Sequence, residues 1–281
     1  MQRSLKKQFL IFVLPTLFAF AIAFVIPFLL GLYLSFTEFR TVTDATFVGL
    51  KNYAAALTNS DGFLSALLFT LRFTATSVIL INVFAFLLAL ALTRNIRGRN
   101  LYRTVFFLPN LIGGIVLGYI WQLIFNGLLL PYSKTLTSSA TYGFWGLVIV
   151  TAWQMIGYIM VIYIAGLGNL PPSILEAAKV DGAGPVRTLF SVMLPNLMPS
   201  ITICLFLTLT NSFKLFDQNL ALTAGAPANQ TNLLALDIYK TFYGRVGAEG
   251  IGQAKAVIFS VLVAAVALLQ LYLTRRKEQE S

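Results

Sequence analysis

Long apolar runs make up most of the chain, and shorter polar stretches separate them. A helix that crosses a bilayer needs about 20 predominantly apolar residues. The runs lack the alternation of polar and apolar positions that is typical of a membrane β-barrel, and backbone groups in lipid must be satisfied internally, so helices are the expected spanning structure. The pattern predicts an all-α membrane protein with one domain and six transmembrane helices. The predicted spans lie at approximately residues 9–36, 71–93, 104–126, 144–167, 197–216 and 256–274.

The composition supports this interpretation and excludes several kinds of site. Hydrophobic residues make up 58% of the 281 residues and charged residues 11%, against about 25% charged residues in soluble domains. The chain has no histidine and one cysteine, Cys204, which excludes an intrachain disulfide, a cysteine metal cluster and histidine-based acid–base chemistry. We therefore expect no metal site and no catalytic residue in this chain.

The net charge of +10 is better explained by basic residues beside membrane spans than by nucleic-acid binding. The loop from Thr93 to Arg103 has four arginines and no acidic residue, and such loops stay in the cytoplasm. With this loop inside, cytoplasmic segments hold 12 of the 20 lysines and arginines. The first apolar run is longer than a signal-peptide core of about 7–15 residues, so we expect it to be retained. Both termini are predicted to be cytoplasmic.

One segment of mixed polarity, at approximately residues 171–196, lies in the cytoplasm under this orientation. Ser173 is suited to cap a helix, and Glu176 follows three residues later, as in a capping box. Gly182 is suited to end that helix in a left-handed conformation, and Pro185 is suited to begin a second helix. The segment is therefore predicted to form a short helix–turn–helix.

The second of these helices has an apolar stripe on one face. Its members recur at helical spacing; they are Val186, Leu189, Phe190 and Met193. From the residues alone, two interpretations remain open: an interfacial loop that covers the helix bundle, or a docking element for a soluble cytoplasmic partner. Pro195 and Pro199 are expected to bend the entry into the fifth span.

The same segment resembles the EAA loop of the permease subunits of binding-protein-dependent ABC importers, and we call it the EAA segment. The residues that carry the resemblance are Glu176-Ala177-Ala178, Asp181-Gly182-Ala183 and Leu194-Pro195. A second stretch is similar to sugar permeases of the MalF type, at Phe213–Asp217, Leu222–Pro227 and Thr231. Ala226 stands where that pattern has its second glycine, so we expect a turn there with a slightly different backbone.

The resemblance implies the fold of a type I ABC importer permease and a subunit without catalytic activity. It implies a second permease subunit of similar fold in a heterodimer, two copies of an ABC ATPase subunit that bind ATP and Mg, and an extracytoplasmic solute-binding protein. This chain has no phosphate-binding loop of the form G-x-x-x-x-G-K-[ST]. We expect no cofactor in it, no nucleic-acid partner, and a location in a bacterial or archaeal plasma membrane, in contact with lipid.

The resemblance also implies that the EAA segment couples the permease to the ATPase. Glu176 would lie near a basic group of the ATPase, and the small residues would allow close contact. The alternative for Glu176 is a capping role alone, and for Gly182 it is only to end the helix. The residues implied in coupling are Glu176, Ala177, Ala178, Asp181, Gly182, Leu194 and Pro195.

The solute path should contain hydrogen-bonding groups and flat aromatic surfaces if the solute is a sugar. Polar residues inside the fourth and fifth spans are candidates because such groups are unfavourable against lipid. The alternative is that each of them only forms hydrogen bonds between helices. The candidates are Thr151, Trp153, Gln154, Tyr158, Thr208, Asn211, Ser212 and Lys214.

The leading hypothesis is therefore an ABC importer permease for a sugar, with an oligosaccharide as the expected solute. The same architecture would also serve another polar solute, such as glycerol phosphate, for which Lys214 is a candidate anion contact. A secondary transporter of a different class would need buried acids or histidines as ion relays, and no acidic residue lies well inside a predicted span. A membrane scaffold without transport activity is the remaining alternative.

Overall fold

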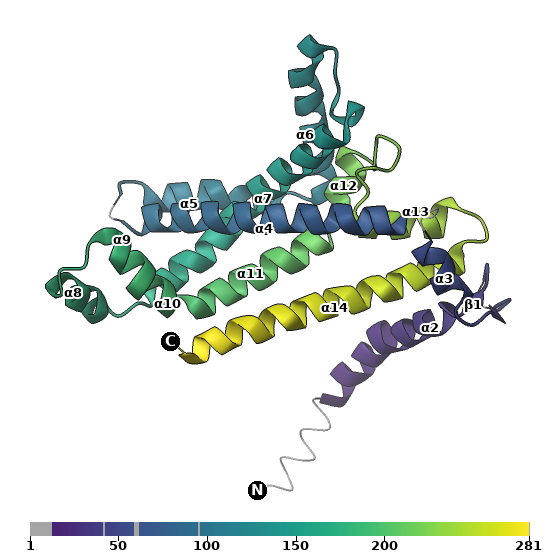
Figure 1. Cartoon of the computed structure of the whole chain (residues 1–281), viewed down its shortest axis with the longest axis horizontal. Coiled ribbons are helices and arrows are strands. Elements are labelled where there is room, and N and C mark those ends of the chain that lie inside the picture. Colours follow the sequence, from purple (N-terminus) through teal and green to yellow (C-terminus); the bar gives the residue numbers. More distant parts are fainter. Residues whose placement is uncertain (1–12, 42, 59–61, 95, 281) are drawn as a thin grey trace, which may run out of the picture. The chain divides into compact units, whose positions relative to one another are not determined.

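The computed structural model describes residues 13–41, 43–58, 62–94 and 96–280, with only the backbone for residues 275–280. The chain divides into two compact units, Met1–Phe63 with Ile238–Ser260 and Leu64–Asp237 with Val261–Ser281. Figure 1 shows that most elements are helices. The beginning of the first predicted span and the basic residues before it lie outside the described residues.

The first unit combines a membrane-length helix, Val13–Leu34, with a small hairpin and a short helix. Asn52 donates from Nδ2 to the carbonyls of Ser35 and Thr37, at 3.0 and 2.8 Å, which satisfies backbone groups where the chain leaves the first helix. Lys255 is fully buried and donates from Nζ to Thr241 Oγ1 at 2.8 Å. The elements that lie wholly in this unit are η1 (Ala21–Val25), α2 (Ile26–Leu34), β1 (Thr37–Glu38), antiparallel β2 (Thr46–Phe47) and α3 (Lys51–Leu57).

The second unit contains the EAA segment, the candidate solute-path residues and the helices that carry them. Helices α4 (Phe63–Thr93), α13 (Leu234–Gly244) and α14 (Glu249–Glu280) contribute to both units. The elements that lie wholly in the second unit are α5 (Arg99–Phe107), η3 (Leu108–Leu111), α6 (Gly114–Leu129), η4 (Leu130–Tyr132), η5 (Leu136–Ser138), α7 (Ala140–Gly168), α8 (Pro172–Val180), α9 (Pro185–Thr188), η6 (Leu189–Met193), α10 (Leu194–Asn196), α11 (Met198–Phe213) and α12 (Asp217–Leu222).

The described residues contain five helices that are long and apolar enough to cross a membrane, or six when one bent pair counts as a span. The bent pair joins Pro185–Asn196 to Met198–Phe213 at an angle of 74°, which places the expected proline-induced bend at the entry to the fifth span. The five unbroken helices are Val13–Leu34, Phe63–Thr93, Gly114–Tyr132, Ala140–Gly168 and Glu249–Thr274.

The boundaries of three spans differ from those expected. The third predicted span, 104–126, is not one helix: α5 ends at Phe107, and the membrane-length helix begins at Gly114. Pro109 lies in the intervening turn, and Gly113 is extended, with φ −61° and ψ 137°, so the helical hydrogen bonds are interrupted there. Helices α4 and α14 begin earlier than expected, at Phe63 and Glu249 rather than near residues 71 and 256.

A hydrogen-bonded asparagine joins three helices in the core of the second unit. Asn82 of α4 accepts a hydrogen bond from the hydroxyl of Tyr163 of α7 at 2.8 Å. Its Nδ2 donates to Thr208 Oγ1 of α11 at 2.9 Å. These polar atoms lie inside an apolar cluster that includes Ile81, Ile159 and other buried side chains, so the network fixes the register of α4, α7 and α11.

Helix α7 also approaches the end of α5 closely. A Cβ atom built on Gly157 would overlap the backbone carbonyl of Phe106, so any larger residue at this position would force the two backbones apart. Gly168, at the end of the same helix, has no atom within 4 Å of a Cβ built there. A side chain therefore fits at Gly168 but not at Gly157, although both glycines lie in α7.

Gly157→Ala should destabilise the protein because the added methyl group must displace backbone rather than a flexible side chain. We expect a loss of about 1–3 kcal/mol, which is typical of overpacking, measured as a lower thermal unfolding midpoint of the purified protein in detergent. Gly168→Ala is the matched control and should leave the midpoint unchanged. Equal midpoints for the two variants would contradict the close α5–α7 contact.

Candidate functional site

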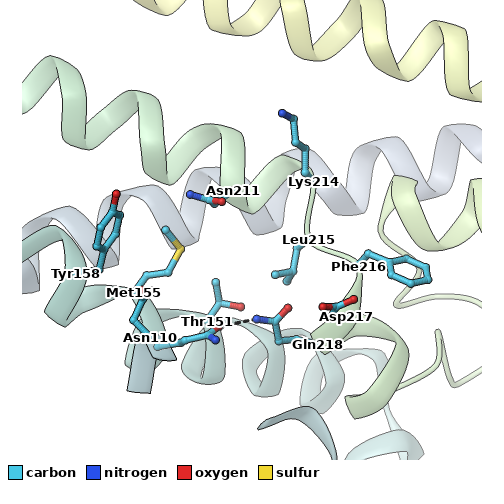
Figure 2. A pocket seen from close by; sticks show the side chains of 11 residues that line it. Asn110, Thr151, Met155, Tyr158, Asn211, Lys214, Leu215, Phe216, Asp217 and Gln218 are labelled. Carbon is cyan, nitrogen blue, oxygen red and sulfur yellow. Dashed lines mark hydrogen bonds between the residues drawn. The ribbon is translucent and has the colours of Figure 1, made fainter. Parts of the chain in front are cut away.

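A pocket of about 500 Å³ lies beside α7 in the second unit, and Figure 2 shows its lining. The residues of α7 follow the spacing i, i+3, i+4 and i+7, so they share one face of the helix. The other walls come from η3, from the end of α11, from the link between α11 and α12, and from the first turn of α12. The lining residues are Asn110, Thr151, Gln154, Met155, Tyr158, Asn211, Lys214, Leu215, Phe216, Asp217 and Gln218.

Two buried glutamines fix one wall of this pocket. Gln218 of α12 donates from Nε2 to Gln154 Oε1 at 2.5 Å. Gln154 in turn donates from Nε2 to the carbonyl of Ile112 at 2.9 Å, in the break between η3 and α6. The chain of amides therefore holds α12, α7 and the helix break together, and it satisfies a backbone carbonyl that the broken helix leaves free.

Two other polar side chains in the pocket, Thr151 and Asn211, form no hydrogen bond to another helix among those that the structure shows. Thr151 Oγ1 is buried and has no hydrogen-bond partner within the described chain. Asn211 donates from Nδ2 to the carbonyl of Leu207, one turn earlier in its own helix, at 2.9 Å. A buried hydroxyl without a partner is unfavourable, so Thr151 is a group that a bound ligand or water would satisfy.

The pocket combines aromatic rings with side chains of opposite charge. Figure 2 shows Tyr158 and Phe216 at opposite ends of the row of labelled side chains. Lys214 and Asp217 both line the pocket, and the Lys214 side chain extends away from Asp217. The two formal charges cancel, so the lining suits a polar ligand without a large net charge.

The structure brings five of the eight predicted solute-path residues together and places three elsewhere. The five that line the pocket are Thr151, Gln154, Tyr158, Asn211 and Lys214. Trp153 points to another face of α7, where its ring packs edge-on against Trp121 at 5.3 Å. Thr208 belongs to the Asn82 network, which is the helix–helix role considered as its alternative. Ser212 is fully buried and does not line the pocket.

Sequence reasoning missed six lining residues. Phe216 and Asp217 lie within the stretch that resembles sugar permeases. Asp217 follows the end of the predicted fifth span, and Phe216 is its last residue but is not polar, so a search for polar residues inside the spans missed both. Asn110 follows Pro109 in the turn that divides the third predicted span, where an unbroken helix was expected. Breaks in apolar helices were therefore the pattern that could have found them. The missed residues are Asn110, Met155, Leu215, Phe216, Asp217 and Gln218.

The expected turn after α12 is present. The amide of Ala226 donates to the carbonyl of Thr223 at 2.8 Å, and Thr231 Oγ1 donates to the carbonyl of Ala226 at 2.8 Å. The left-handed backbone falls at Ala224 and Gly225, with φ of 46° and 81°, and not at Ala226. Alanine therefore fits the position where the similar permeases have a second glycine, because that position does not require positive φ.

The EAA segment consists of α8, a tight turn and the helical stretch from Pro185 to Asn196. Gly182 has φ +72°, and its amide donates to the carbonyl of Lys179 at 3.1 Å. The amide of Ala183 donates to the carbonyl of Ala178 at 2.9 Å. These two bonds form a Schellman motif, so the prediction that Gly182 ends the helix is confirmed, as is the start of the second helix at Pro185.

The predicted capping box is wrong. Helix α8 begins at Pro172, its N-cap is Pro171, and no side chain caps it. Ser173 therefore lies inside the first turn, because the proline pair sets the helix start two residues earlier than predicted. Glu176 makes no capping bond and is exposed, as are Ala177, Asp181 and Gly182, whereas Ala178 is buried and Leu194 and Pro195 are half-buried.

Residues 81–279 match the family model described as binding-protein-dependent transport system inner membrane component. This match covers more than half of the chain, from α4 through the pocket and the EAA segment to α14. The chain therefore belongs to the family of inner-membrane components of binding-protein-dependent transport systems. Together with its apolar helices, this membership establishes a multi-pass permease subunit of the ABC transporter class.

Individual relatives agree with the family assignment. The chain is 44% identical to the probable starch degradation products transport system permease protein AmyD of Thermoanaerobacterium thermosulfurigenes, over 96% of this chain and 94% of the relative. It is 30% identical to the multiple sugar-binding transport system permease protein MsmF of Streptococcus mutans, over 95% of each. A bacterial ABC transporter that imports the acidic polysaccharide alginate has the same fold, with a TM-score of 0.82, 20% identity and 98% coverage of both chains.

Gln154→Leu should destabilise the second unit because it leaves the buried amide of Gln218 and the carbonyl of Ile112 without their partner. We expect a loss of about 1–3 kcal/mol, measured as a lower thermal unfolding midpoint in detergent. The double variant Gln154→Leu/Gln218→Leu should lose less than the sum of the two single variants, since the residues are coupled. Strictly additive losses would contradict the amide chain.

Proposed function

We propose that this chain forms one half of the translocation path of an ATP-driven importer for an oligosaccharide, with starch-derived glucose oligomers as the solute class. The observation that carries the proposal is the pocket of Figure 2, in which uncharged hydrogen-bonding groups lie between two aromatic rings. Sugars present hydroxyl groups and flat apolar faces, which such a lining matches. The names of the relatives AmyD and MsmF support the same solute class.

Glycerol phosphate, or another anionic solute, is the second candidate. Lys214 lines the pocket and favours it. Asp217 lines the same pocket and opposes it, because its carboxylate repels a phosphate group while the net formal charge of the lining is zero. A neutral oligosaccharide needs no excess positive charge, so the balance of the two side chains supports the sugar.

The proposal places ATP hydrolysis on other subunits. The partners are a second permease of similar fold, two ABC ATPase subunits that bind ATP and Mg, and an extracytoplasmic solute-binding protein. The sequence has no phosphate-binding loop of the G-x-x-x-x-G-K-[ST] form, which supports this division of roles. Lysines and arginines are concentrated in the loop from Thr93 to Arg103 and in the other segments on the same side of the predicted spans. This excess supports cytoplasmic termini and a cytoplasmic EAA segment.

The EAA segment is proposed as the contact with the ATPase. Its first helix exposes Glu176, Ala177 and Asp181 and ends in the Schellman turn at Gly182. Small exposed residues allow a partner to approach closely, and the two backbone bonds of the turn fix the direction of the chain into α9. A displacement imposed on α8 would then pass into α11 through the bent helix, rather than being absorbed by a loose loop.

Asn211→Leu should lower solute transport while leaving the fold intact, because the Asn211 amide bonds only within its own helix. Loss of one uncharged hydrogen bond to the moving sugar should slow transport about threefold to tenfold. The measurement is uptake of labelled maltotriose into proteoliposomes that hold the complete transporter. Ser212→Ala is the matched control, since Ser212 is adjacent but does not line the pocket.

Equal uptake by the Asn211→Leu variant and the wild type would contradict the role of this pocket. The second candidate solute is tested in the same preparation with Lys214→Gln. If that variant alone abolished transport of a phosphate ester that the wild type carries, the anionic solute would replace the sugar.

Gly182→Val should uncouple ATP hydrolysis from transport. A β-branched side chain at φ +72° costs roughly 1–2 kcal/mol, so the turn would rearrange and α8 would change direction. We expect normal amounts of inserted protein and loss of solute-stimulated ATPase activity in nanodiscs. Gly184→Ala is the control because Gly184 has φ −68° and open space around a Cβ atom. Normal stimulated activity in Gly182→Val would show that the segment only covers the bundle.

A further inference from the structure

A second cavity lies at the other end of the second unit, between the last turn of α4 and the helices of the EAA segment. Its volume is about 790 Å³, and we call it the α4–α9 groove. Seven of its 11 lining residues are apolar, and the other four are two threonines, one arginine and one lysine. The apolar residues are Leu90, Leu175, Ala183, Pro185, Val186, Leu189 and Met193.

The charges in the α4–α9 groove have one sign. Arg94 and Lys179 line it, and no acidic side chain does. Both side chains are exposed, and neither forms an ion pair within the part of the chain that the structure describes. Arg97 and Arg99, which lie outside the lining, add further positive charge at the beginning of α5. The groove is therefore complementary to an anion with an apolar body.

The groove also lies at the depth where a membrane span ends. The apolar stretch of α4 ends at Thr93, and Leu90, Thr93 and Arg94 all contribute to the groove. A lipid phosphate lies at this boundary between hydrocarbon and water, with its acyl chains on the apolar side. The apolar and basic parts of the groove thus follow the same order along α4 as the parts of a phospholipid.

We propose that the α4–α9 groove binds an anionic phospholipid, with the headgroup phosphate between Arg94 and Lys179 and an acyl chain against the apolar wall formed by Val186, Leu189 and Met193. The lipid would fill the space between α4 and the EAA segment and so support the position of the segment. That the lipid comes from the cytoplasmic leaflet rests on the proposed orientation; the existence of the site does not.

The surface next to the groove supports a lipid as the occupant. Val186 and Phe190 are 69% and 63% exposed, although they belong to the apolar stripe of the second helix of the segment. Exposed large apolar residues beside basic ones are typical of a helix that lies in the membrane interface. An acidic protein partner would match the two cations but would leave this apolar surface without a matching environment.

The test measures lipid binding to the full chain with its co-purifying subunits, by native mass spectrometry with added phosphatidylglycerol or phosphatidylcholine. Wild-type protein should bind phosphatidylglycerol at least tenfold more tightly than phosphatidylcholine. Arg94→Gln/Lys179→Gln should weaken phosphatidylglycerol binding about 30-fold, as expected for two basic residues near a headgroup, and leave phosphatidylcholine unchanged. Arg97→Gln/Arg99→Gln is the matched control, since it removes the same charge nearby without altering the lining.

Three results would overturn the proposal. They are equal affinity for the two lipids, an equal loss in the control variant, and displacement of phosphatidylglycerol by inorganic phosphate, which would make free phosphate the ligand. A photoreactive benzoylphenylalanine at Leu189 adds an independent readout in nanodiscs: a lipid adduct supports the site, and an adduct to an ATPase polypeptide assigns the groove to protein. Because lipid binding is measured without transport, its failure is distinguishable from failure of the proposed importer function.

Discussion

The side-chain amides inside the second unit depend on one constraint: a polar group placed among apolar helices must find its partner within the protein, because lipid offers none. Asn82 meets this constraint by bonding to α7 and α11 together. Gln154 meets it by joining α12 to the carbonyl of Ile112. The first network sets the register of the helices, and the second sets the wall of the pocket. The shape of the pocket therefore depends on the hydrogen bonds of two of its own lining residues, Gln154 and Gln218.

Interruptions in the helices supply several further lining residues of the pocket. The turn at η3 brings Asn110 to the lining, the link between α11 and α12 brings Lys214 and Phe216, and the first residue of α12 is Asp217. In a membrane protein, irregular backbone is tolerated where it is buried in protein or faces a cavity. The close contact at Gly157, which admits no Cβ, keeps α5 and α7 together just before the first of these interruptions.

In the EAA segment, backbone hydrogen bonds rather than side-chain hydrogen bonds fix the shape. The expected cap by Ser173 is absent, and prolines set the beginning of both of its helices. The turn between them is held by two backbone bonds that need positive φ at Gly182. This arrangement leaves Glu176 and Ala177 of α8 exposed, and it leaves a groove beside α4 that is lined by apolar and basic side chains.

Hydropathy alone determined that the chain is a multi-pass helical membrane protein and where its spans approximately lie, because burial in lipid acts on short runs of residues. The φ preference of glycine predicted the turn at Gly182, and the motifs, rather than hydropathy, indicated the ABC permease class. Five of the polar residues selected from the fourth and fifth spans line one pocket, and their role in the solute path stays a prediction. The sequence could not show that Trp153 faces away from the pocket or that Thr208 bonds to Asn82, since hydropathy does not reveal which face of a helix meets which neighbour. Only the tertiary structure decided where the third span breaks, because that depends on how the helices pack, and it brought Asn110 and Gln218, 108 positions apart, to the lining of one pocket.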